Sequence, residues 1–152
     1  MVGDGGYLKE TLIVYKSADE IVNNSAALQD DNHLVLPLIA NEVNLFQFYL
    51  LLTYNTGGIK AAVNGPALIE LNMGAVGMSD AGVGYNTAGV QTAYNANVFL
   101  RGPGGAESGF AVISGQIKVS VAGNLILRWA QNAAVANDTT IKKGSWFEVK
   151  RI

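Results

Sequence analysis

The sequence of 152 residues contains no cysteine and a single histidine, His33. Without cysteine the chain has no thiolate nucleophile, no disulfide and none of the zinc or iron–sulfur sites that use cysteine ligands. A transition-metal site usually takes several histidine or cysteine ligands, so one histidine is a poor basis for such a site. The composition therefore disfavours a zinc enzyme and thiol-based redox chemistry.

Charged residues are also scarce, at 14% of the chain, against roughly 25% in an average globular protein. The formal net charge is only −2, so the chain lacks the electrostatic footprint of a nucleic-acid-binding protein, and we expect no nucleic-acid partner. A surface so poor in charge must be covered by small polar and apolar side chains. Such a surface favours packing against other chains over a dispersed monomer.

Apolar runs such as the LLL of residues 50–52, within NLFQFYLLLTY, are far shorter than the roughly 20 residues of a membrane-spanning helix. The opening MVGDGGYLKE, residues 1–10, lacks the basic start and apolar core of a signal peptide. We therefore expect no membrane partner and a soluble protein made in the cytoplasm of its producer. The length suggests one domain, residues 11–152, and we expect residues 1–10 to form a flexible arm ahead of it.

Apolar and polar residues alternate along much of the chain, and glycine, asparagine, aspartate and proline separate the alternating runs. This period of two is typical of strands that bury one face. In QIKVSVAG, for example, Ile117, Val119 and Val121 fall on the same face. No segment predicts a helix, because the asparagines and serine of residues 23–25 interrupt the weak helical spacing of DEIVNNSAALQDD.

The number of these runs predicts an all-β fold, a single-domain antiparallel β-sandwich of the jelly-roll kind with eight to ten short strands. The glycine-rich region 74–109 is the least regular part of the chain. There we expect long loops, with one or two short strands such as NVFLR at residues 97–101. In HLVLPLIAN, Pro37 favours an edge strand or a bulge.

The segment NLFQFYLLLTY, residues 44–54, is apolar on both faces. A strand of this kind is covered on both sides. One cover is the second sheet of the sandwich, and the other is either a loop or a neighbouring copy of the chain. The second apolar row supplies three candidate interface residues and the arm supplies two more: Leu45, Tyr49, Leu51, Tyr7 and Leu8.

The segment LILRWAQN, residues 125–132, places an arginine beside a tryptophan. In a strand, Trp129 and Gln131 share a face and Arg128 points the other way, so the two side chains cannot line one pocket. We interpret Trp129 as an anchor of the core. We also expect residues 145–151 to pair antiparallel with residues 125–131, which would place Arg128 and Glu148 on one outer face.

His33 lies in LQDDNHL beside Asp30 and Asp31, where a metal or acid–base site is conceivable. The acids lack the spaced carboxylates of a loop calcium site, and glycosidase chemistry needs two opposed carboxylates in one cleft. We interpret the stretch as a turn in which aspartate accepts backbone hydrogen bonds and His33 opens the next strand. The chain also lacks a G-x-S-x-G elbow, and RGPGGAESG lacks the lysine of a phosphate loop. We therefore predict no enzyme activity, no catalytic residue, no metal and no cofactor.

Three segments resemble a family of small structural proteins of tailed bacteriophages. AGNLILRWAQN and DTTIKKGSWFEVKRI, at residues 122–132 and 138–152, resemble the carboxyl end of that family. YKSADEIVNNSAALQDDNHLVLPLIANEV, at residues 15–43, resembles its opening. The resemblance covers about residues 12–54 and 115–152 and leaves the centre of the chain uncovered.

The resemblance implies a β-rich virion component with no enzymatic residues. Proteins of this kind occur as head-decorating, or cement, proteins and as parts of tail fibres. We expect a homotrimer that binds the major capsid protein and stabilises the outside of the head. The alternative is a tail-fibre or receptor-binding module that recognises the host surface through the loops of residues 74–109.

Overall fold

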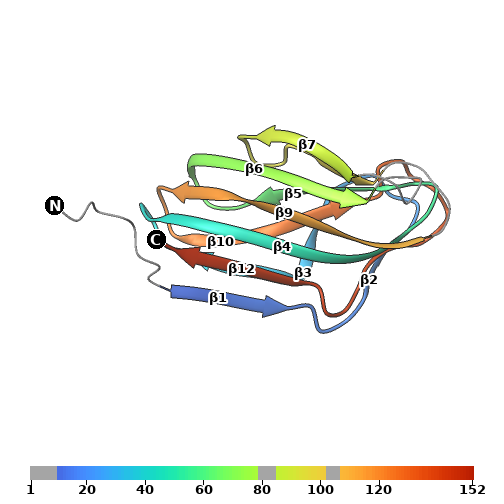
Figure 1. The fold of residues 1–152 in the computed structure, drawn as a ribbon, viewed down its shortest axis with the longest axis horizontal. Coiled ribbons are helices and arrows are strands. Elements are labelled where there is room, and N and C mark those ends of the chain that lie inside the picture. Colours follow the sequence, from blue (N-terminus) through green and yellow to red (C-terminus); the bar gives the residue numbers. More distant parts are fainter. Residues whose placement is uncertain (1–9, 79–84, 102–106) are drawn as a thin grey trace.

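The computed structural model describes residues 10–78, 85–101 and 107–152, and these residues contain strands and no helix (Figure 1). No helix within these ranges is long and apolar enough to cross a membrane. The described residues form twelve strands. They are β1 (Glu10–Tyr15), β2 (Glu20–Val22), β3 (Gln29–Leu38), β4 (Val43–Tyr54), β5 (Ile59–Asn64), β6 (Leu68–Met78), β7 (Tyr85–Gln91), β8 (Val98–Arg101), β9 (Glu107–Val119), β10 (Gly123–Ala130), β11 (Thr139–Ile141) and β12 (Trp146–Arg151).

The strands form two antiparallel sheets that face each other. The larger sheet has the order β1-β12-β4-β9-β6-β7, with β11 pairing both β4 and β2 beside it. The smaller sheet has the order β3-β10-β5-β8. The fold is thus the all-β sandwich that the alternation predicted.

The connectivity is that of a jelly roll. Successive pairs β1/β12, β3/β10, β4/β9 and β5/β8 are nested within one another, as in a single long hairpin that folds over itself. The pairs lie alternately in the larger and the smaller sheet, so neighbouring chain segments lie on opposite sides of the core. β6 and β7 are inserted between β5 and β8 and extend the larger sheet beyond β9.

The core lies between the sheets and follows the predicted faces. Inward residues of β4 and β12 meet in it, and Phe48 stacks on Phe147 with ring centroids 4.0 Å apart. The inward rows of β3, β4, β5 and β10 are all buried: Leu34, Leu36 and Leu38; Phe46, Phe48, Leu50 and Leu52; Ile59, Ala61 and Val63; Leu125, Leu127 and Trp129. Pro37 is exposed in β3, an edge strand of the smaller sheet, as its missing N–H predicts.

Three details of the predicted fold are wrong. The strands number twelve instead of eight to ten, and the described part of region 74–109 is mostly strand, from the end of β6 to the start of β9. Gly77 packs closely within β6, where a Cβ would lie 2.4 Å from the Leu100 carbonyl oxygen. Val121 is 58% exposed because β9 ends at Val119 and the chain turns there.

The predicted pairing of residues 145–151 with 125–131 is also wrong. β12 lies between β1 and β4 in the larger sheet, and β10 lies between β3 and β5 in the smaller one. Glu148 therefore stands opposite Ile13 and Gln47, while Arg128 is on the other sheet. The jelly-roll crossover between β10 and β12 separates two strands that an ordinary hairpin would have paired.

Candidate functional site

The predicted core anchor lies on the inner side of the larger sheet, and the predicted interface residues of β4 lie on its outer side. Trp129 is fully buried between the sheets, as expected. Leu45, Tyr49 and Leu51 point away from the core, on the outer face of β4. Leu45 is 40% exposed and the other two are half-buried. Tyr7 and Leu8 lie outside the described residues, as does the arm apart from Glu10, which begins β1.

A row of large apolar side chains crosses the outer face of the larger sheet at the level of Tyr49. Tyr15 stands opposite Trp146, which stands opposite Tyr49. On the other side, Tyr49 pairs with Val112, and Val112 with Val76. We call these five residues the outer apolar row: Tyr15, Trp146, Tyr49, Val112 and Val76.

Aromatic stacking fixes the middle of the outer apolar row. The Tyr49 ring stacks on Trp146 and on Phe110, each with centroids 5.7 Å apart and planes within about ten degrees of parallel. Both ends of the row remain accessible, since Tyr15 is 63% and Val76 41% exposed. The row therefore presents a rigid apolar surface that the core of this chain does not cover.

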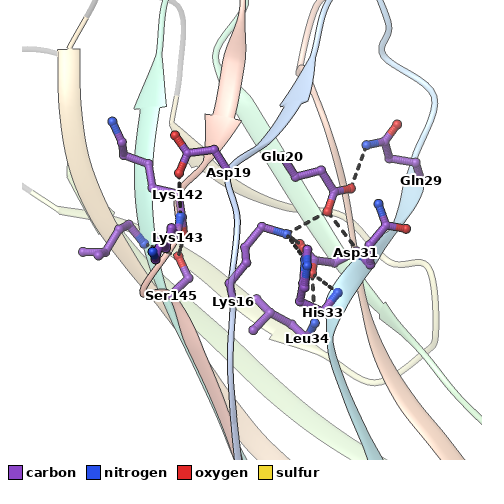
Figure 2. A network of polar contacts seen from close by, with 12 residues as sticks. Lys16, Asp19, Glu20, Gln29, Asp31, His33, Leu34, Lys142, Lys143 and Ser145 are labelled. Atoms are coloured by element: carbon purple, nitrogen blue, oxygen red, sulfur yellow. Dashed lines mark hydrogen bonds and ion pairs between the residues drawn. The ribbon is translucent and has the colours of Figure 1, made fainter.

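A second feature is a cluster of charged side chains at the corner where β1, β2 and β3 meet (Figure 2). The Lys16 side chain is fully buried, and its Nζ lies 2.7 Å from Glu20 Oε2 and 2.7 Å from Asp31 Oδ2. His33 Nδ1 lies 3.3 Å from the same nitrogen. Asp31 is fully buried too, whereas the Glu20 side chain is 10% exposed.

The backbone positions both members of the buried ion pair. The Lys16 N–H donates to the Ser145 carbonyl at 2.7 Å, and the Lys16 carbonyl accepts from the Gly144 N–H at 2.9 Å. Asp31 Oδ1 accepts from the N–H groups of His33 and Leu34, each at 2.9 Å. The sequence correctly predicted that an aspartate here accepts local backbone hydrogen bonds.

A bulge in β3 turns Asp31 inward. The register with β10 shifts so that residues 31–34 of β3 stand opposite Leu127 alone. Because of the extra residues, Asp31 and Leu34 both reach the interior, although simple alternation would place them on opposite faces. His33 consequently lies within β3, which begins at Gln29, and does not open the strand as predicted.

The convergence of Glu20, Asp31 and His33 resembles a metal-ligand set, with one ligand atom of each lying within 4.8 Å of the others. The Lys16 ammonium already contacts all three, however, and its charge occupies the place that a divalent cation would take. The cluster is therefore better described as a buried lysine with three partners than as a metal centre. The predicted absence of a metal remains a prediction.

Neither Lys16 nor Glu20 is predicted from the sequence as a member of this cluster, although the pattern contains a signal for Lys16. In ETLIVYK the inward positions are Leu12 and Val14, both packed on the core, and the next inward position is Lys16. A lysine on the buried face of a strand needs partners of opposite charge. Acids occur nearby in sequence, but the bulge that brings Asp31 to the lysine is not visible in the spacing.

Gln131 has a structural role that follows from its burial beside Trp129. Its Oε1 accepts from the N–H groups of Ser25 and Val135, each at 3.1 Å, and its Nε2 donates to the Asn137 carbonyl at 2.6 Å. One side chain thus joins the turn after β2 to the loop after β10. Gln131 therefore holds two loops together. Arg128 is not part of this arrangement, and its Nε lies 2.7 Å from Asp30 Oδ1.

Two surface depressions offer no catalytic arrangement. One, of about 290 Å³ on the outer face of the larger sheet, is lined by residues that include Leu45, Gln47 and Ser114. The other, of about 480 Å³, is lined by Asn55, Thr56 and residues 136–138. Neither lining places a nucleophile beside a histidine base.

A comparison with known protein families, with curated proteins and with solved structures finds no match for this chain. The resemblance of the two ends of the sequence to phage structural proteins thus remains a hypothesis. Any functional conclusion has to rest on the surfaces and clusters described above.

Proposed function

We propose that this protein is a structural component of a bacteriophage virion, a decoration protein that binds the outside of the head as a homotrimer. The observation that carries the proposal is the outer apolar row, an uncovered apolar surface on a sheet whose core face is already packed. Jelly rolls build viral capsid domains as well as lectins and cupins, so the fold agrees with this function without selecting it. The sequence resemblance supplies the connection to phage.

A second copy of the chain is the proposed cover for the outer apolar row. The surface is poor in charge, with 14% charged residues in the chain, and the row crosses five strands of the larger sheet, β1, β12, β4, β9 and β6. Contacts between identical copies stay finite only when the symmetry closes, whereas open contacts give filaments. A closed ring of three copies buries the row and leaves the ends of the sandwich free.

The capsid-binding surface in this proposal is one end of the sandwich. Three chain segments meet there and each exposes a large apolar residue: Ile39 (42%) in the turn after β3, Ile69 (51%) at the irregular start of β6 and Val121 (58%) in the turn after β9. We call these three residues the tip patch. Backbone hydrogen bonds from Asn41 N–H to the Val119 carbonyl and from Ser120 N–H to the Ala67 carbonyl tie these segments together.

The two termini of the described chain reach the same end. The Ile152 N–H donates to the Val43 carbonyl beside the turn that carries Ile39, and Glu10 pairs with Arg151 (Figure 1). Residues 1–9 precede Glu10 and thus join the domain next to the tip patch. In our proposal the arm and the tip patch bind the major capsid protein together.

Sedimentation of purified protein tests the oligomer. We expect the parent chain to sediment as a trimer at micromolar concentration. Tyr15→Asp and Leu45→Asp introduce charges at exposed positions of the outer face and should give a monomer that is still folded. Phe99→Asp is the matched control, because Phe99 is 51% exposed on the smaller sheet, and it should sediment like the parent.

Two results would count against the proposal: a parent chain that sediments as a monomer, or a trimer that the Phe99→Asp control disrupts and Tyr15→Asp does not.

The position on the virion needs a separate experiment. Electron microscopy of virions with the protein labelled should show the label on the head. A label on the tail would instead favour the receptor-binding alternative.

A further inference from the structure

We propose that Lys16 and Asp31 condense within the folded protein to form an isopeptide bond, with Glu20 transferring the protons. The amine and the carboxyl group are in contact, with Nζ 2.7 Å from Oδ2, and both side chains are fully buried. Glu20 Oε2 lies 2.7 Å from the same nitrogen (Figure 2). This inference is independent of the proposed virion function.

The fold holds the nucleophile against the carbon that it would attack. Adding one carbon–oxygen bond to the 2.7 Å contact places Nζ within about 4 Å of Asp31 Cγ, close to the roughly 3–3.5 Å of a reactive geometry. Lys16 is fixed by its two backbone hydrogen bonds to residues 144–145, and Asp31 is fixed by the β3 bulge. Neither group has to be brought into place from solvent.

The two oxygens of Asp31 have different surroundings, as the reaction requires. Oδ1 accepts hydrogen bonds from the N–H groups of His33 and Leu34, each at 2.9 Å. As Nζ adds to Cγ, negative charge develops on Oδ1, and the same two donors stabilise it in the manner of an oxyanion hole. Oδ2 faces the lysine and is the oxygen that leaves.

The step balances without a further reactant. The Lys16 ammonium transfers a proton to the Glu20 carboxylate, and Glu20 passes it to Asp31 Oδ2. The free amine then attacks Cγ of the neutral carboxyl group to form the carbon–nitrogen bond, and Glu20 passes a second proton from Nζ to Oδ2. The Cγ–Oδ2 bond breaks, water leaves, Oδ1 becomes the amide carbonyl oxygen and Glu20 returns to its starting form. No oxidation or reduction takes place.

Burial supplies the driving force. A buried ion pair carries the desolvation cost of two charges, and condensation removes both charges. Because the fold already holds the two groups in contact, the reaction also avoids the entropy loss of an encounter in solution. The 10% exposure of the Glu20 side chain gives the departing water a route to solvent. The product joins the β1 edge of the larger sheet covalently to the β3 edge of the smaller sheet.

The mass of the intact, full-length protein tests the proposal directly. We expect purified protein to weigh less than its sequence by the mass of one water. After complete denaturation, trypsin cannot cleave behind a modified Lys16, and the next lysine or arginine is Lys60. The digest should contain residues 10–60 as one peptide lacking one water, with fragmentation linking Lys16 to Asp31. The full sequence mass, or a lost water at another pair, would overturn the proposal.

Glu20→Gln tests the proton-transfer role, because glutamine keeps the size of the side chain and can still accept from Lys16. We expect this variant to fold by circular dichroism but to keep the full mass and be cleaved behind Lys16. A Glu20→Gln protein that still loses water completely would overturn the role of Glu20. If the variant does not fold, the mass and digest of the parent chain still decide the proposal.

Glu148→Gln is the matched control. Glu148 pairs with Lys150 at 2.9 Å, but the lysine side chain is 41% exposed, so the pair has no burial to drive condensation. This variant should lose one water as the parent does. Loss of the modification in Glu148→Gln would mean that the reaction does not depend on the buried cluster.

Discussion

Trp129 and Arg128 are neighbours in sequence with very different surroundings. Trp129 is fully buried, yet its Nε1 has no hydrogen-bond partner among the described residues. Arg128 is partly exposed and contacts Asp30, Asn95 and the Leu28 carbonyl. The tryptophan thus stabilises the fold through packing alone, and the arginine through surface contacts.

We predict that Trp129→Ala lowers the free energy of unfolding by about 3–5 kcal/mol, the usual cost of removing a large buried aromatic. Trp129→Phe should cost less, because the unpaired indole N–H makes no hydrogen bond that is lost. Arg128→Ala should cost on the order of 1 kcal/mol, as for other exposed ion pairs. Urea unfolding of the three variants measures the order, and a greater loss for Arg128→Ala would contradict it.

Tyr94 is a second residue whose buried polar atom lacks a partner. Its hydroxyl is buried without a hydrogen bond in the described structure, and this desolvation raises the pKa of the phenol to about 12. The folded protein then keeps a proton that the unfolded chain releases near pH 10. Stability from this group is complete below about pH 10 and declines as the pH rises toward 12.

We predict that spectrophotometric titration of the folded protein shows one tyrosine ionising about two pH units later than an ordinary phenol. Tyr94→Phe should remove that late phase. At neutral pH this variant should be as stable as the parent or slightly more stable, because the hydroxyl is buried unpaired. A late phase that persists in Tyr94→Phe would assign it to another tyrosine.

At the scale of elements, the sequence predicted which faces of the strands are buried but not which strands pair. The spacing in β9 and β10 correctly placed Ile117, Val119 and Trp129 on buried faces, since burial of one face depends only on local spacing. The partner of β12 depends instead on where the chain crosses between the sheets. Nothing in residues 145–151 encodes that crossover, so the expected pairing with β10 was wrong.

Local rules mispredict two other elements. The glycines of region 74–109 predict loops, whereas Gly77 lies within β6 where the β8 backbone approaches closely. The sequence predicts that the strand carrying His33 begins at that residue, whereas β3 begins at Gln29 and contains a bulge that includes Asp31. Bulges and close approaches are tertiary features, and a single sequence does not reveal them.

The corner of β1, β2 and β3 also yields a prediction about metals. Lys16 Nζ occupies the space between Glu20, Asp31 and His33, and it leaves no place for a divalent cation there, either as an ammonium or as the amide nitrogen proposed above. We therefore predict that the melting temperature is the same with and without a chelator. A large fall in melting temperature on chelation would contradict this. Added zinc or calcium that raises the melting temperature would do so as well.

At the scale of the whole molecule, the jelly roll separates the proposed surfaces. The outer apolar row lies across the broad face of the larger sheet, and the tip patch lies at the end of the sandwich where β1 begins and β12 finishes. A ring of copies formed through the broad faces leaves all of the ends exposed. The same fold can therefore form an oligomer and bind a second surface without competition between the two contacts.

The last prediction concerns the arm. Deleting residues 2–9 leaves β1 complete, because Glu10 still pairs with Arg151 at the sheet edge. The truncated chain should thus melt and sediment like the parent, yet co-sediment more weakly with phage heads that lack the protein. In the proposed trimer, three arms would raise the apparent affinity even if each binds weakly, so their loss should lower binding strongly. Ile21→Ser, on β2, is the control with unchanged binding, because Ile21 is 56% exposed outside both proposed surfaces. Equal binding of the truncated and full-length chains would leave capsid attachment to the tip patch alone.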